Sequence, residues 1–476
     1  MNHHRSFAVI CGLSFWMIVH QSFRKYGSFK VGVDSTESLL FDRAEEFNAL
    51  SEGIPFRETT WLRPWFKHLG KSQTTCFITV IDDDDRIRGV LPLERFGSRG
   101  WQWVGAGLCT DHTSVITREA DREPVTRCIG EFLLKNVADP ELGWDRLHFD
   151  GVVAGDPGMD LLLQQLGDAN NIRLQSRTNV WFRSCTEGWE SYLQGASRRQ
   201  RRRHRTALRL LEETELPLEV RFAEDASSVA HYVSELIRLH QKHWRSQGQP
   251  GSYSKPGTRD FIQESTLEAL ERGRLLMPAL FRTDPDTGEE RIIAVQIHFV
   301  GDDQRMYCYS VGMDYDYADI KPGNLLNSFL LRMAHDGMHP GIDLMRGDEE
   351  YKKRMSADPV PLLIADVFAP TLCGQLDRLG HDFSLRVKQF YRQRRGRPLA
   401  HQLQHDEAFA KGYQAFLPNH AKGNSQINDP AANKAGITSD IGSHDESSSS
   451  EEPIDEGPIL LPFGNFLADP VHPLSP

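Results

Sequence analysis

The residues best suited to acid–base chemistry lie directly after a buried-looking strand expected at 341–345. They are Arg346, Asp348, Glu349, Tyr351 and Lys352. Polar side chains at the end of a strand are well placed to line a crevice of an α/β sheet. A carboxylate there could accept a proton, and the phenol could donate one. The structural alternative for the same residues is a salt-bridge corner.

A second candidate is the helix start expected at 319–326, which follows a β meander. Pro322 suits the first helical turn, and Gly323 lets backbone N–H groups approach a ligand. A helix N-terminus beside Lys321 is a suitable seat for a pyrophosphate, although a proline–glycine helix start is also a common turn. The end of the meander adds aromatic and acidic side chains at Tyr309, Asp314 and Tyr315.

The third candidate is an arginine-rich segment at 198–209. Ser197 and Gln200 form a capping box, which predicts that a helix begins here. Guanidinium groups match phosphate geometry, so the segment is a candidate grip for a phosphate or a polyanion. The alternative is a solvated helix face that is partly paired with the glutamates at 212, 213 and 215. No aromatic platform accompanies the arginines, and a DNA-binding module is therefore not expected.

Two α/β units must position these candidates. We expect the first at 33–184 and the second at 185–372, each with helices, a β meander and a helix–strand return. The shared order indicates a structural duplication. Residues 373–400 are expected to form a basic helix. Residues 1–32 are expected to be disordered or signal-like, with an apolar run at 7–19 that is too short to span a bilayer.

Charge is unevenly distributed along the 476 residues. The net charge is −11, but residues 401–476 contain 11 acidic and three basic side chains, which leaves a nearly neutral body. This tail is poor in apolar residues and is expected to be disordered. The seven cysteines show no paired spacing, which favours reduced thiols and a cytoplasmic location. The acidic run at 82–85 is expected to be a hairpin turn, so no metal site is expected.

The order of these segments resembles the CelD/BioF-like acyltransferases of the GNAT superfamily. The resemblance rests on Tyr-Ser-Val-Gly-Met-Asp-Tyr-Asp at 309–316, Lys-Pro-Gly-Asn-Leu-Leu at 321–326 and Ile-Asp-Leu-Met-Arg-Gly-Asp-Glu-Glu-Tyr-Lys at 342–352. It implies tandem GNAT-like domains of the α/β (α+β) class, with mixed central sheets flanked by helices. The second domain would transfer an acyl group to an amine, with acyl-CoA (acetyl-CoA) as co-substrate and no metal.

The resemblance also implies roles for individual residues. Catalysis would fall to Arg346, Asp348, Glu349 and Tyr351. The cofactor would be bound by Tyr309, Lys321, Pro322, Gly323 and Asn324. The acceptor would be bound by Arg199, Arg203, Asp314, Tyr315 and Lys352. Only one glycine of the usual Gln/Arg-x-x-Gly-x-Gly/Ala loop is present at 321–324, so the identity of the donor stays open.

The implied acceptor is a small-molecule or glycan amine in exopolysaccharide or cell-envelope biosynthesis, with peripheral association with envelope-biosynthesis proteins. One alternative is a FemAB-type transferase that moves an amino acid from aminoacyl-tRNA onto a peptidoglycan precursor, and tRNA is a partner only in that case. The long helical arm that such enzymes often carry has no counterpart here. Another alternative is a non-catalytic scaffold in polysaccharide assembly.

Overall fold

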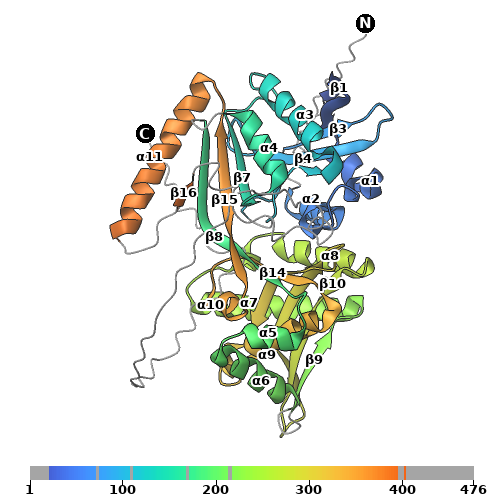
Figure 1. Ribbon diagram of the computed structural model, residues 1–476, viewed down its shortest axis with the longest axis vertical. Coiled ribbons are helices and arrows are strands. Elements are labelled where there is room, and N and C mark those ends of the chain that lie inside the picture. Colours follow the sequence, from blue (N-terminus) through green and yellow to red (C-terminus); the bar gives the residue numbers. More distant parts are fainter. Residues whose placement is uncertain are drawn as a thin grey trace, which may run out of the picture.

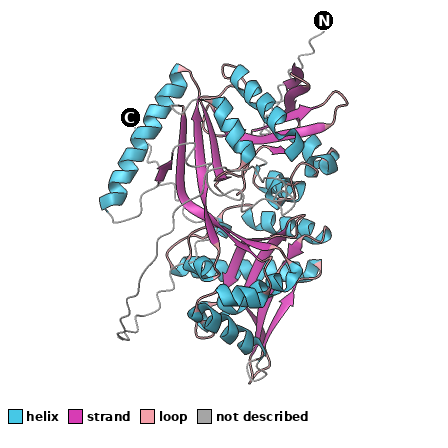
Figure 2. Ribbon diagram, in the orientation of Figure 1, coloured by secondary structure: helices cyan, strands magenta, loops and turns pink. Residues whose placement is uncertain are grey.

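The computed structural model describes residues 21–70, 74–107, 111–167, 171–212, 217–394 and 401–403. Within them, one mixed sheet of 16 strands runs through both halves of the molecule and is flanked by helices (Figures 1 and 2). This confirms the expected mixed α/β class. The apolar run at 7–19 and the acidic tail from residue 404 onward lie outside the described residues.

The first half begins with a hairpin that the sequence analysis did not expect. β1 (Gln21–Tyr26) and β2 (Phe29–Asp34) pair with each other, and β2 pairs with β3 (Thr75–Ile81). Residues 21–32, part of the 1–32 segment that was expected to be disordered or signal-like, therefore belong to this hairpin. The hairpin is stable because Val31 and Val33 are fully buried in the main core.

Further elements complete the first half. They are η1 (Ser38–Asp42), α1 (Ala44–Asn48), η2 (Pro55–Arg57), α2 (Thr59–His68), β4 (Ile87–Arg95), β5 (Gly100–Trp103), β6 (Ile116–Thr117), η4 (Glu119–Asp121), α3 (Arg122–Lys135), β7 (Arg146–Val153), α4 (Pro157–Leu166) and β8 (Ile172–Ser184). The acidic run between β3 and β4 is a turn, as predicted. Asp82 accepts hydrogen bonds there from the backbone N–H groups of Asp84 and Arg86.

The second half starts with two consecutive helices. α5 (Trp189–Gly195) and α6 (Arg198–Glu212) are separated at Ser197. The predicted capping box is confirmed. The N–H of Gln200 donates to Ser197 Oγ at 3.3 Å, and the N–H of Ser197 donates to Gln200 Oε1 at 2.9 Å. These bonds satisfy donors at the start of α6, which fixes the break between the helices.

Further elements follow in chain order. They are β9 (Leu218–Phe222), α7 (Ala226–Ser246), η5 (Ser252–Ser254), α8 (Thr258–Glu271), β10 (Leu275–Leu276), β11 (Pro278–Thr283), β12 (Glu290–Val300), β13 (Met306–Met313), η6 (Tyr315–Tyr317), α9 (Pro322–Met333), η7 (Ala334–Met338), β14 (Gly341–Arg346), α10 (Glu350–Arg354), β15 (Asp358–Phe368), α11 (Leu372–Arg394) and β16 (His401–Leu403). α7 and α8 pack on the main core, whereas α5, α6 and α9 cover the opposite face.

The two halves exchange a strand, which differs from the expected boundary between them at 184/185. β15 inserts between β7 and β8, so residues 358–368 complete the sheet of the first half. β8 continues beyond β15 and pairs with β14 of the second half. Figure 2 shows β8 and β15 as long strands that reach from one half into the other. The continuous sheet fixes how the halves sit against each other.

Candidate functional site

A gap in the second half of the sheet is the natural place for a ligand. β13 and β14 are parallel and pair only at Met306–Ile342 and Tyr307–Asp343. Beyond these positions β14 turns toward β8, and Arg346 pairs with Val180. The two neighbouring strands therefore diverge from about residue 308 of β13 and residue 344 of β14 onward. Crevices at the carboxyl ends of parallel strands are common ligand sites in open α/β sheets.

A β-bulge lies on one side of this gap. Ile297 pairs with Ser310 and the next residue of β12, His298, pairs with Cys308, so Tyr309 is the extra residue. The Tyr309 ring is buried against Trp61 and Phe299. A bulge bends its strand and often lies beside an active site. It explains how β13 leaves the direction of β14, and it places predicted residue Tyr309 at the gap.

The other side of the gap is a strained turn that is held by Lys352. Met345 has a φ of 58°, which is uncommon for a residue other than glycine, and Gly347 has a φ of 120°. Lys352 is 1% exposed, and its Nζ donates to the carbonyls of residues 345, 346 and 347 at 3.0, 2.9 and 3.1 Å. The same ammonium pairs with Glu349 at 2.9 Å. Lys352 therefore positions the turn.

Glu349 and Tyr351 bring proton-transfer chemistry to the gap. Burial raises the pKa of the Glu349 carboxyl, and the Lys352 ammonium lowers that pKa by a smaller amount. Burial raises the pKa of the Tyr351 phenol well above its usual value, and Cys308 and Glu349 act in the same direction. Tyr351 is thus a proton donor at neutral pH. Cys308 is itself a protonated thiol, because burial raises its pKa to about 12.

Arg346 joins the two halves of the molecule. It is 7% exposed, its Nε donates to Asp111 at 2.8 Å, and its guanidinium pairs with Asp150 at 3.1 Å. Burial lowers the pKa of Arg346, but the two carboxylates outweigh burial and raise it. Asp348 is exposed and accepts hydrogen bonds from Asn179 Nδ2 at 2.7 Å and Trp181 Nε1 at 3.1 Å. Both predicted residues have structural partners on the first half or on β8.

The corresponding gap in the first half is closed by the chain itself. β5 and β7 are parallel and pair from Gly100–Arg146 to Gln102–His148. Beyond them, residues 111–116 run beside β7 and are buried. The N–H of Thr113 donates to the carbonyl of Gly151, and its Oγ1 donates to the carbonyl of Asp150 at 2.6 Å. We call residues 111–116 the plug segment.

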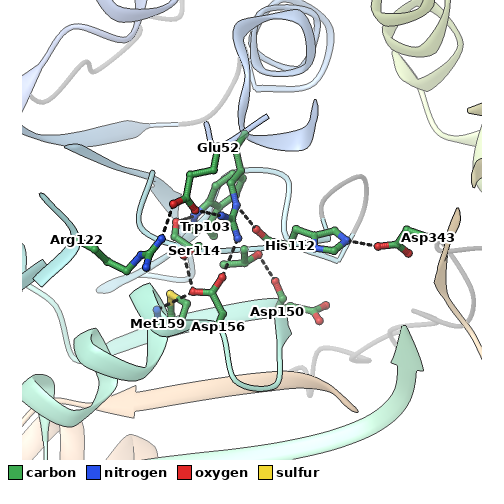
Figure 3. Close-up of polar contacts among 11 residues, drawn as sticks. Glu52, Trp103, His112, Ser114, Arg122, Asp150, Asp156, Met159 and Asp343 are labelled. Carbon is green, nitrogen blue, oxygen red and sulfur yellow. Dashed lines mark hydrogen bonds and ion pairs between the residues drawn. The ribbon is translucent and has the colours of Figure 1, made fainter. Parts of the chain in front are cut away.

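Buried ion pairs hold the plug segment in place (Figure 3). His112 Nε2 lies 2.8 Å from Asp343 of β14, and its carbonyl accepts a hydrogen bond from Arg57 Nε. Arg57 pairs with Asp156 at 2.9 Å, and Ser114 Oγ donates to the same carboxylate at 2.6 Å. The sequence analysis missed this network because its members are scattered over almost 300 positions. No local spacing could have revealed it.

The start of α9 differs from a simple pyrophosphate seat. Lys321 is exposed and adopts a left-handed conformation with φ 54°. Pro322 has no N–H, the N–H of Gly323 donates to Met313 Sδ at 3.2 Å, and the N–H of Asn324 donates to the Lys321 carbonyl at 2.9 Å. The first amides of α9 are thus engaged locally. The exposed Lys321 ammonium is the group here that is suited to an anion.

The predicted acceptor-binding residues are distributed over three places. Asp314 pairs with Lys242 of α7 at 2.7 Å, and Tyr315 stacks on His243 with ring centroids 4.4 Å apart. Arg199 is exposed and Arg203 half-buried on α6. The structure therefore brings Tyr309, Glu349, Tyr351 and Lys352 to the gap, whereas Asp314 and Tyr315 anchor the following loop to α7.

α6 presents a row of cations on its outer face. The groove along it is lined by Arg198, Arg201, Arg202, Arg205, Thr206 and Arg209. His204, on the inner face, bonds to the Tyr192 hydroxyl at 3.1 Å and Ser328 Oγ at 2.9 Å, which holds α6 against α5 and α9. Gln200 Nε2 donates to the Arg354 carbonyl at 3.1 Å, so α6 begins beside the end of α10.

A buried polar chain behind the gap also escaped the sequence analysis. His298 Nε2 bonds to Gln296 Oε1 at 2.8 Å, and Gln296 Nε2 donates to Asn327 Oδ1 of α9 at 2.8 Å. Burial lowers the pKa of His298 to about 3, so the ring is neutral. The sequence signal for this polar chain was that Gln296 and His298, two positions apart, place polar side chains on one face of the apolar strand β12. Among the described residues, no group of three or more side chains could hold a metal ion.

Both a family model and solved structures are similar to this chain. Residues 198–353 match a family model described as an acetyltransferase (GNAT) domain. The crystal structure of FemX is similar over 71% of this chain and 98% of its own, with 11% identity and a TM-score of 0.51. The C-terminal domain of a putative lysylphosphatidylglycerol synthetase from Agrobacterium fabrum is similar over 71% of this chain and 96% of its own, with 12% identity and a TM-score of 0.44.

A tandem GNAT protein from the clavulanic acid biosynthesis pathway covers 72% of this chain and 99% of its own, with 11% identity and a TM-score of 0.39. No curated protein matches the sequence. The diverging strands β13 and β14 and the helices α7 and α9 fall within the matched segment. The chain therefore has a GNAT-like α/β fold, and its residues 198–353 match the GNAT domain model.

Proposed function

We propose that the protein is an acyltransferase that moves an acyl group from acyl-CoA onto an amine. The observation that carries this proposal is the gap between β13 and β14, with its bulge at Tyr309, inside the segment that matches the GNAT domain. A thioester bound in this gap would lie between the bulge and the turn held by Lys352. Glu349 and Tyr351 flank the same place.

In the proposed reaction, the amine nitrogen bonds to the thioester carbonyl carbon and the carbon–sulfur bond breaks. Glu349 accepts the proton from the nitrogen, and Tyr351 donates a proton to the thiolate that leaves. Lys352 and Arg346 are positioning residues, because their charged groups are occupied by the turn carbonyls and by Asp111 and Asp150. The protonated Cys308 thiol favours direct transfer over a cysteinyl intermediate.

Tyr351→Phe tests the assignment of the acid. We expect turnover to fall at least tenfold while the melting temperature stays the same, because only the hydroxyl is removed. Tyr317→Phe, at a half-buried tyrosine of η6 whose ring lies under the Arg282 guanidinium, is the matched control and should leave turnover unchanged. The role of Tyr351 is wrong if its variant keeps turnover within about threefold of the wild type. The pH profile tests Glu349, since kcat/KM should rise with pH through a pKa above the ordinary glutamate value of about 4.3.

The donor is tested by ligand-induced stabilisation of the full chain. Coenzyme A, acetyl-CoA and longer acyl-CoA are compared, and a thioester at 100 times its dissociation constant should add about 2.7 kcal/mol to the free energy of unfolding. Aminoacyl-tRNA is the second candidate donor, favoured by the cation row on α6 and by the locally engaged amides of α9. Stabilisation by charged tRNA, with none by any thioester, would select that donor.

The acceptor class follows from the resemblance to the CelD/BioF-like group, which favours a small-molecule or glycan amine in exopolysaccharide or cell-envelope biosynthesis. The exposed residues at the rim of the gap, Asp348 and Glu350, suit a cationic or polar acceptor. Asp348→Asn should then raise KM for the amine more than it lowers turnover. An unchanged KM for every amine tested would remove Asp348 from the acceptor site.

A further inference from the structure

We infer that α11 docks the protein on an anionic lipid surface, with the helix lying flat and its apolar side facing the bilayer. α11 lies along the outside of the first half (Figure 1). Its large apolar side chains point away from the protein and are 37–78% exposed. They are Leu372, Leu376, Leu379, Phe383, Val387, Phe390 and Tyr391. Their spacing of mostly three or four residues places them in one stripe about 28 Å long.

The inner face of α11 is polar, which reverses the usual arrangement of a surface helix. Asp382 forms a paired contact with Arg173 of β8, with two N–O distances of 2.9 Å. His381 Nε2 lies 3.4 Å from the buried carboxylate of Asp366 on β15. Leu385 is the one large apolar side chain of α11 that is buried. These polar contacts therefore hold α11 to the body and leave its apolar stripe in solvent.

An exposed stripe of this size marks an interaction surface. Soluble monomers rarely expose contiguous apolar patches larger than a few hundred Å². A helix with an apolar face and flanking arginines and lysines is typical of proteins that lie in the membrane interface. None of the helices in the described ranges is long and apolar enough to cross a bilayer. Peripheral binding through α11 needs no such helix.

Charge complementarity selects an anionic lipid as the partner. From residue 386 to residue 397 the sequence holds six basic residues and no acidic one. They are Arg386, Lys388, Arg392, Arg394, Arg395 and Arg397. Arg386 and Arg394 are exposed beside the stripe, and the Arg394 guanidinium lies 4.7 Å from the Phe390 ring. Anionic headgroups attract such clusters, and their attraction adds to the burial of the apolar stripe.

A second copy of the chain fits the same surface less well. A parallel pair of α11 helices would place the two basic clusters against each other. An antiparallel pair would place each cluster beside Asp377 and Asp382, but Asp382 is already paired with Arg173 and Arg378. The positive charge of α11 therefore has too few complementary carboxylates in a second copy. A lipid surface offers anionic groups along the whole helix.

The test is binding of the full chain to sedimented vesicles. We expect at least tenfold tighter binding to vesicles of equal parts phosphatidylcholine and phosphatidylglycerol than to phosphatidylcholine alone, and weaker binding as salt is raised. The double variant Leu379→Glu with Phe383→Glu should reduce binding at least tenfold. Both side chains are exposed, so the fold should be kept. Met338→Glu, at a residue 60% exposed on η7, is the control and should bind as the wild type does.

Two results would overturn this inference. In the first, the double variant binds anionic vesicles as tightly as Met338→Glu does. In the second, the wild type is a dimer that the double variant dissociates, while neither protein binds vesicles, and a second copy then covers α11. Vesicle binding needs no turnover, so this outcome is separate from that of the proposed function. Conversely, the double variant should keep full activity toward a water-soluble amine.

Discussion

The two halves of this molecule share one topological feature and use it differently. In each half, two parallel strands pair for two or three positions and then diverge. In the first half the space beyond the divergence is filled by the plug segment, which is tied down by Asp156, Asp343 and Arg57. In the second half it is flanked by a bulge, a strained turn and α10.

This difference indicates that the first half has a structural role at this position and that the second half is the place for a ligand. A buried polar network requires nearly complete satisfaction of its members, and it therefore gives rigidity rather than room for a ligand. In the second half the raised pKa values are those of Glu349 and Tyr351 beside the gap, whereas in the plug segment the raised pKa is that of Asp111, whose carboxylate is paired with Arg346. Perturbed titratable groups in a crevice are typical of functional sites. Arg346 links the two regions, because it lies at the end of β14 and pairs with Asp111 of the plug segment.

The largest expected effect comes from breaking that link. Arg346→Met would leave Asp111 and Asp150 buried without their cation, and we expect the free energy of unfolding to fall by about 3–5 kcal/mol. Urea denaturation would measure this loss. Arg291→Met is the control, since Arg291 forms an exposed pair with Glu289, and exposed pairs contribute little to stability. Equal stability of the two variants would show that the halves do not depend on Arg346.

A smaller effect concerns a buried carboxyl beside β5. Burial raises the pKa of Glu94 to about 7 from an ordinary value of 4.5. The folded state then keeps a proton that the unfolded chain loses, so stability is greatest below pH 4.5 and falls as the pH rises to 7. The loss would be at most about 3 kcal/mol. Glu94→Gln should remove this pH dependence, measured by denaturation at several pH values, and an unchanged slope would contradict the assignment.

The smallest expected effect is a loss of stability from a substitution in the plug segment, and it tests whether only the second half carries the function. Thr113→Val removes one hydrogen bond from the plug segment, and we expect a loss of about 1 kcal/mol in stability with no change in kcat or KM. Tyr351→Phe in the second half should show the opposite pattern, with lower turnover and unchanged stability. If Thr113→Val alters KM for the acyl donor while Tyr351→Phe does not alter turnover, the functional gap is in the first half.

Local signals in the sequence predicted much of the fold. The capping box at Ser197 marked the start of α6, and the acidic run at 82–85 marked the turn between β3 and β4. The sequence analysis did not predict β15, although its residues 362–368 are all buried. Its place between β7 and β8 is a long-range pairing, which no local pattern records.

The sequence by itself determined which residues could do chemistry and placed Glu349, Tyr351 and Lys352 in one segment after a strand, because side chains within a turn of each other must share a neighbourhood. Only the tertiary structure decided what each group contacts. In the folded protein Lys352 donates to three carbonyls, Arg346 pairs with two carboxylates of the first half, and Asp314 pairs with Lys242 of α7. The tertiary structure also turned the apolar side of α11 outward, since an ion pair with β8 and a histidine–carboxylate contact with β15 hold the helix by its polar face. Burial and partners come from contacts between distant segments, and they set the pKa values and the accessibility on which function depends.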